Sequence, residues 1–193
     1  MRLYTSQSLE VVEILMRDGI YKPSFEKCGM IEISLEIERP YRWLMEQYNI
    51  IKKNEFSSAA VWWQTSLKEA LKCFKNSATV ETNQTLLVAN VDDRDVLLLD
   101  RDLWSEGPFS VCPLWFRGHS LYMSNDWNDQ YEELFNKLWL LKDKNIPAME
   151  ETWKHIFKLT KQTKMIHAIT PFIYKSWIIP RKKLENQDEF NEM

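Results

Sequence analysis

Glycine is scarce in this sequence, with 4 residues in 193, and proline is limited to 7. This composition excludes the long flexible linkers formed by segments rich in these residues. Hydrophobic residues at 45% and charged residues at 27% are ordinary globular values. A chain of this length buries roughly 70% of its unfolded surface. We therefore expect one α+β domain over residues 1–184, followed by a polar tail over 185–193.

Cysteine is also sparse, and long apolar runs are missing. Cys28, Cys73 and Cys112 are odd in number and lack CxxC spacing, which argues against a disulfide framework or a structural zinc site and favours a reducing compartment. No stretch approaches the roughly 18 apolar residues of a membrane helix, and the opening residues lack the apolar run of a signal peptide. The sequence predicts a cytoplasmic protein without a membrane partner.

The short motifs of common enzymes are absent: there is no HExxH, Walker loop, GxGxxG or GxSxG. Carboxylates do gather around one predicted strand, where hard cations find several oxygen ligands. A metal-dependent nuclease is therefore one alternative, built on Asp92, Asp95, Asp100 and Asp102. Aspartates at strand ends also form turns and cap helices. Because this role explains the cluster without a metal, we assign no metal ligand.

Aromatic residues are abundant: 9 Trp, 9 Phe and 7 Tyr. Nine tryptophans exceed the usual needs of packing, so we expect some to line a groove or a partner surface. Trp62 and Trp63 are adjacent on a predicted strand and must point to opposite faces. Binding hot spots are enriched in Trp, Tyr and Arg, and our predicted binding residues are Trp63, Trp104, Trp115 and Arg117.

Charge is divided unevenly along the chain. The stretch Glu81–Glu133 has 11 acidic and 3 basic residues, whereas Lys142–Lys183 has 10 basic and 3 acidic residues. The two stretches can attract each other within the fold. Alternatively, the basic region 142–183 contacts nucleic acid phosphates, or the acidic stretch mimics them.

Local patterns predict a small mixed or antiparallel sheet packed with several helices. Strands are expected at Arg2–Thr5, Ala59–Trp63 and Thr85–Val91, and an apolar run follows at Val96–Leu99. Ile166–Ile179 is either two strands or one strand bent at Pro171. Helices are expected before Gly19, from Ser66 to Phe74, over 126–141 and after Pro147. The alternating Ile31–Ile37 segment is consistent both with a strand and with the start of the helix that follows.

Several stretches, taken in order, resemble a bacterial family, domain of unknown function 3841. They are Arg2–Gln7 with Gly19, Tyr41–Leu44, Val61–Trp63, Val96–Asp100 with Trp104, and Glu151–Phe157. The sequence departs from the family pattern over Pro108–Phe116 and at His167, where the family pattern has glutamine.

The resemblance implies an order of parts similar to ADP-ribosyltransferase-like folds, with NAD as cofactor. Thr5 or Gln7 would take the polar position on the first strand, and Trp63 with Ser66 the aromatic and small polar positions on the second. His167 would take the late-strand position of a Glu or Gln. Imidazole cannot stabilise an oxocarbenium-like state as a carboxylate does, so the NAD-dependent transferase is an alternative and not the leading hypothesis.

A compact chain with an altered site and many aromatics is similar in style to inhibitors made by phages and mobile elements, including anti-CRISPR proteins. Our leading prediction is a non-catalytic intracellular binding or inhibitor protein that docks on a larger protein or ribonucleoprotein, with an RNA-guided nuclease as the specific partner.

Overall fold

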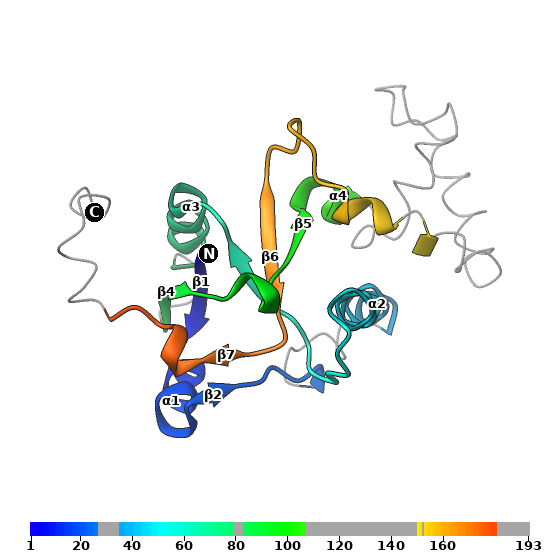
Figure 1. Ribbon diagram of the computed structural model, residues 1–193. Helices are drawn as coiled ribbons and strands as arrows, with labels where there is room; N and C mark the ends of the chain where they lie inside the picture. The colour runs from blue at the N-terminus through cyan, green and yellow to red at the C-terminus, as the bar shows by residue number, and fades with distance from the viewer. Residues whose placement is uncertain (27–34, 79–82, 107–149, 152, 181–193) are drawn as a thin grey trace. The chain divides into compact units, whose positions relative to one another are not determined.

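The computed structural model describes residues 1–26, 35–78, 83–106, 150–151 and 153–180 (Figure 1). By the density of its internal contacts the chain divides into two compact units. One unit is formed by Met1–Leu98 with Ile166–Met193, and the other is Leu99–Met165. Among the described residues, no helix combines the length and the apolar character needed to cross a membrane.

A five-stranded sheet has the order β4-β1-β3-β6-β5. Its strands are β1 (Arg2–Ser8), β3 (Val61–Gln64), β4 (Gln84–Asn90), β5 (Leu97–Asp100) and β6 (Ile166–Thr170). The pairings β1–β4, β1–β3 and β3–β6 are antiparallel. A second sheet, which we call the ribbon, pairs β2 (Ile20–Tyr21) with β7 (Ile173–Tyr174) in antiparallel fashion. The predicted α+β class with a small sheet and several helices is confirmed.

The described helices are α1 (Leu9–Asp18), α2 (Leu35–Lys52), α3 (Leu67–Ala78) and α4 (Arg101–Glu106). Short 3₁₀ turns are η2 (Asp93–Asp95), η4 (Lys154–Phe157) and η5 (Lys175–Trp177). The Ser8 hydroxyl caps α1 by accepting from the Val11 amide. Gly19 ends the helix in the left-handed region at φ 77°, as predicted from its position.

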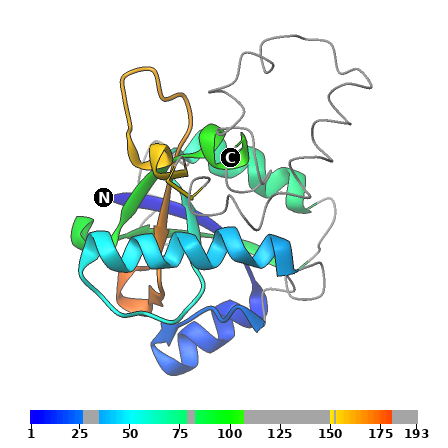
Figure 2. The same cartoon turned by 90° about the vertical axis from the view of Figure 1, so that its right-hand side faces the viewer.

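The ambiguous segment before Pro40 becomes helix from Leu35 onward, so the alternation does not continue as a strand there. Figure 2 shows α2, in cyan, as one continuous helix. Pro40 lies inside this helix. Proline lacks the amide that would bond to the preceding turn, and buried residues further along hold the helix in place. These are Trp43, Leu44, Met45 and Tyr48.

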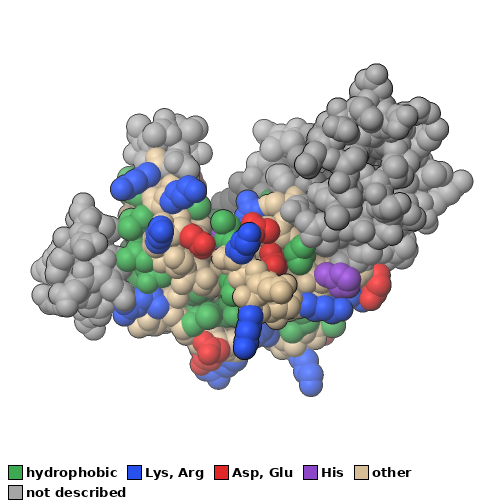
Figure 3. Space-filling model, turned by 90° about the horizontal axis from the view of Figure 1, so that it is seen from above, with side chains coloured by type: hydrophobic (Ala, Val, Ile, Leu, Met, Phe, Trp, Pro, Cys, Tyr) green, Lys and Arg blue, Asp and Glu red, His purple; other side chains and the backbone are tan. Residues whose placement is uncertain are grey.

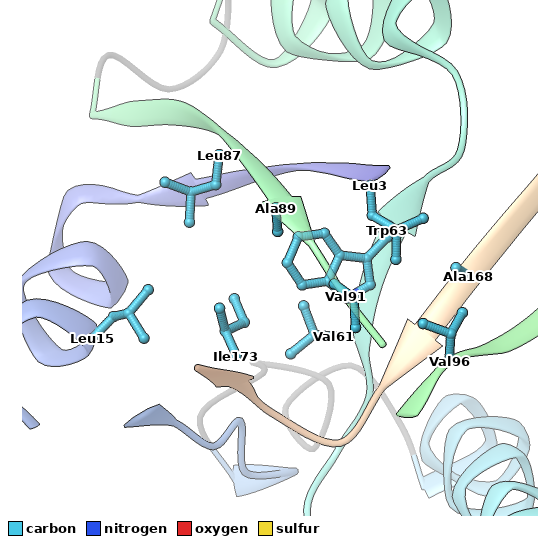
Figure 4. Close-up of a cluster of buried hydrophobic side chains, with 10 residues drawn as sticks. All are labelled: Leu3, Leu15, Val61, Trp63, Leu87, Ala89, Val91, Val96, Ala168 and Ile173. Atoms are coloured by element: carbon cyan, nitrogen blue, oxygen red, sulfur yellow. The ribbon is translucent and has the colours of Figure 1, made fainter. Parts of the chain in front are cut away.

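The two faces of the sheet in the first unit carry different cores. The Leu3 face holds the larger cluster, in which Trp63 lies among small and branched side chains from β1, β3, β4 and β6 (Figure 4). Leu15 of α1 and Ile173 of the ribbon belong to the same cluster. On the opposite side, which we call the Tyr4 face, Tyr4 and Val88 pack against Ala70 of α3.

Pro171 separates β6 from β7, which settles the choice between one bent strand and two. Residues 167–170 pair with β3, and residues 173–174 leave the large sheet to form the ribbon. The predicted helix over 126–141 and Pro147 lie outside the described residues. The segment containing Ile156 and Phe157 is described as the 3₁₀ turn η4.

Candidate functional site

The three strands that the transferase interpretation requires do lie side by side. β3 lies between β1 and β6, and the register places Tyr4 opposite Gln64 and Gln64 opposite His167. Residues directly opposite each other in an antiparallel sheet share a face, and their neighbours along each strand share the other. The register therefore decides which of the predicted site residues can meet.

The predicted transferase residues are divided between the two faces. Trp63 lies opposite Ala168 on the Leu3 face. Alternation along β1 places Thr5 and Gln7 on that same face, where the Gln7 amide nitrogen donates to Thr5 Oγ1 at 2.8 Å. His167 lies on the Tyr4 face with Gln64. Thr5, Gln7 and Trp63 therefore do not converge with His167 on one site.

Trp63 is a core residue. Its side chain is fully buried, and its indole Nε1 donates to Thr170 Oγ1 at 2.9 Å. Thr170 in turn donates to the carbonyl of Phe172 at 2.7 Å. Neither the expected stacking on nicotinamide nor the expected contact with a partner is open to Trp63 in this arrangement, because its ring and its donor are both already used. Ser66 is half-buried at the start of α3, and its carbonyl accepts from the Ala70 amide.

Trp104 is also buried, at 3% exposure, so the expectation that it presents its ring to a partner is corrected in the same way. Trp104 lies on α4, and that helix contacts η4 within the second unit. The indole is therefore used for apolar packing and is not presented to a partner. The other two predicted binding residues, Trp115 and Arg117, lie outside the described residues.

The Tyr4 face brings together a set of residues that sequence reasoning did not assign as a site. The rings of Trp62 and His167 lie 6.3 Å apart at 68°, and the rings of Trp62 and Tyr41 lie 6.2 Å apart at 78°. His167 is 7% exposed, whereas Trp62 is only half-buried. Gln64 Oε1 is buried and has no hydrogen-bond donor among the described residues. The alternation in Val61–Gln64 was the signal that could have predicted this set.

We call Trp62, Tyr41, Gln64 and His167 the Trp62 set. The chemistry available to these four side chains is limited. They are an imidazole, a carboxamide and aromatic rings, and none is a carboxylate that could stabilise a developing positive charge. The nearby Ser6 hydroxyl already donates to Gln84 Oε1 at 2.6 Å. This set therefore forms a packed polar and aromatic layer between sheet and helix.

Two aspartates of the nuclease alternative, Asp92 and Asp100, use their carboxylates to accept hydrogen bonds from backbone amides. Asp92 caps η2 by accepting from the Arg94 amide. Asp100 is 8% exposed and accepts from the Leu103 amide at 3.0 Å at the start of α4. The carbonyl of Asp95 accepts from the Tyr48 hydroxyl at 2.9 Å. Over the described ranges no three acidic, His or Cys side chains are close enough together to hold a metal ion, so these residues give the nuclease alternative no support.

An exposed aromatic residue is found on the outer side of the ribbon. Ile173 points into the core at 0% exposure, and Tyr174 points outward at 39% exposure. Phe172 and Trp177 hold the Tyr174 ring at centroid distances of 4.6 and 5.1 Å. The alternation Ile173-Tyr174 between Pro171 and Lys175 is the only sequence signal for this position.

Three neighbours complete this outer surface, which we call the ribbon face and define as Met16, Ile20, Tyr174 and Lys175. Ile20 lies opposite Tyr174 in the ribbon register. Met16 is 42% exposed in the last turn of α1, and its carbonyl accepts from Lys175 Nζ at 2.9 Å. Figure 1 shows α1, β2 and β7 side by side. The guanidinium of Arg17 nearby pairs with Asp18 at 2.7 Å and holds the pKa of that carboxyl below its usual value, so Lys175 provides the net positive charge of this surface.

Comparison with protein-family models found no match. Comparisons with curated proteins and with solved structures also found no match. The resemblance to domain of unknown function 3841 therefore stays a prediction from the sequence.

Proposed function

We propose that this protein is a non-catalytic binding protein that docks on a larger protein or ribonucleoprotein through the ribbon face. The observation that carries the proposal is Tyr174, an aromatic side chain exposed to 39% and held in place by two further aromatic rings. A tyrosine fixed in this way offers a large contact area and loses little conformational entropy on binding.

The composition of the ribbon face supports the same role. Hot spots of protein interfaces favour Tyr, Trp and Arg, and methionine is enriched at such surfaces. Tyr174 lies opposite Ile20, and the Lys175 ammonium donates to the Met16 carbonyl. The division of the predicted transferase residues between two faces supports a binding role over an enzymatic one. Trp115 and Arg117 remain predicted contributors.

The specific form of the proposal is inhibition of an RNA-guided nuclease, as in anti-CRISPR proteins. The test is a binding titration of the purified protein against guide-loaded nucleases, together with capture from a host lysate. Tyr174→Ala should lose about 2 kcal/mol of binding free energy, which is about thirtyfold in Kd. Ile50→Ala is the matched control, because Ile50 is 68% exposed on α2 and lies outside the ribbon face.

The outcome distinguishes binding through the ribbon face from binding that does not involve it. A partner that is lost with Tyr174→Ala and retained with Ile50→Ala supports the ribbon face as the docking surface. If every captured protein binds both variants as it binds the unmodified chain, the proposal is wrong.

A further inference from the structure

The loop between η4 and β6 concentrates positive charge at regular intervals. Lys158, Lys161 and Lys164 follow one another every third residue, and all three side chains are exposed. The sequence contains no Asp or Glu from Thr152 to Leu184. We call residues 158–164 the lysine turn. Figures 1 and 2 draw it in yellow to orange as an open loop that leads into β6.

The lysine turn is held by its own hydrogen bonds. The Thr160 amide donates to Thr163 Oγ1, and the Gln162 amide donates to Thr160 Oγ1, both at 3.1 Å. The Thr163 amide also donates to the Thr160 carbonyl at 3.1 Å. Each threonine hydroxyl uses a lone pair in these bonds and keeps its own O–H as a donor. The backbone is therefore fixed while hydroxyl and ammonium donors remain.

Among the residues that the structure describes, none neutralises the three ammonium groups. Within the part of the chain that the structure describes, none of them forms an ion pair or a hydrogen bond. Lys154 differs, because its ammonium is paired with Glu151. Figure 3 shows Lys and Arg side chains distributed over the described part of one surface, with fewer acidic side chains between them.

We propose that the lysine turn binds the phosphate backbone of a nucleic acid without reading its sequence. Most protein contacts to nucleic acid are made to phosphates, by Lys and Arg, by Thr and Gln side chains and by backbone amides. The lysine turn offers these donor types within seven residues. Lysine is depleted in the centres of protein–protein interfaces, and the exposed residues of the turn include no aromatic anchor, so nucleic acid fits this surface better than a protein does.

The lysine turn shares no residue with the ribbon face, so the two surfaces can be tested separately. The experiment is a fluorescence-anisotropy titration of the full chain with single-stranded RNA, single-stranded DNA and duplex DNA. The test variant replaces all three lysines (K158Q, K161Q and K164Q). The control variant removes equal charge from the exposed lysines of α3 (K68Q, K72Q and K75Q).

Counterion release sets the expected size of the effect. Three phosphate contacts to a single strand contribute about 2 to the slope of log K against log salt, and their loss lowers affinity about 100-fold near 0.1 M salt. The lysine-turn variant should show both changes, and the α3 variant should stay within about threefold of the unmodified chain. Circular dichroism spectra confirm that both variants are folded.

Three results would overturn the proposal. One is that the protein binds none of the three nucleic acids. Another is equal loss of affinity in the α3 variant, which would indicate general charge attraction. The third is equally tight binding of a polyglutamate peptide, which would make the surface a site for acidic protein segments.

Discussion

At the scale of single residues, the two adjacent tryptophans have opposite environments, and this difference can be measured. Trp63 is fully buried with its indole bonded to Thr170, whereas Trp62 is half-buried on the other face. Trp63→Phe should lower the free energy of unfolding by about 2–3 kcal/mol, because it removes buried volume and a donor to Thr170. Trp62→Phe should cost less than about 1 kcal/mol. Urea unfolding followed by circular dichroism gives both values, and equal costs would contradict the assigned faces.

The stability of the fold should depend on pH through the hydroxyl of Tyr48. Burial, and secondarily the charge of Asp95, raises the pKa of the Tyr48 hydroxyl far above its usual value, so the fold favours the neutral phenol. In the unfolded chain the phenol ionises near a pH of about 10. The stabilisation is therefore complete below that pH and falls above it, by up to about 1.4 kcal/mol per pH unit.

The matched variant is Tyr48→Phe. At neutral pH it should be about 1 kcal/mol less stable, because the hydrogen bond to the Asp95 carbonyl is lost. Above a pH of about 10 its disadvantage should shrink and then reverse, since Phe has no proton to lose. Urea titrations of both proteins across this pH range test the prediction, and a constant difference between them would contradict it.

At the scale of elements, the sequence predicted those ends of helices and strands that local backbone chemistry controls. The C-terminal end of α1 at Gly19 and the break at Pro171 follow from backbone restrictions that any chain obeys. The alternation before Pro40 was ambiguous, because periodicity alone does not separate a strand from the first turn of a helix. The face on which each site residue lies depends on the register Gln64–His167, a long-range pairing that no local pattern encodes.

Gly19 tests the local part of this account. Its φ of 77° disfavours an L side chain, although a Cβ atom there would meet nothing within 4 Å. Gly19→Ala should therefore cost about 1 kcal/mol from backbone strain alone. Gly19→Asn should cost less, because asparagine tolerates the left-handed region. Thermal and urea unfolding measure the two costs, and an alanine variant as stable as the unmodified chain would refute the strain argument.

At the scale of the whole molecule, the proposal for the lysine turn predicts that its charges serve a partner and not the fold. The sequence left both readings open, because a charge count does not show which groups pair. The structure shows the lysine turn without ion pairs among the described residues. Exposed charges without partners contribute little to stability, so the variant K158Q, K161Q and K164Q should keep its free energy of unfolding within about 0.5 kcal/mol.

The salt dependence of unfolding makes this last prediction decisive. If the turn were held by the acidic stretch Glu81–Glu133, the unmodified chain would lose stability as salt rises, and the triple variant would begin at the lower value. If the turn is free, the two unfolding curves coincide at every salt concentration while the affinities for nucleic acid differ. Urea titrations at low and high salt distinguish these cases. A destabilisation of more than about 1 kcal/mol in the variant at low salt would assign the lysines to the fold instead of to a partner.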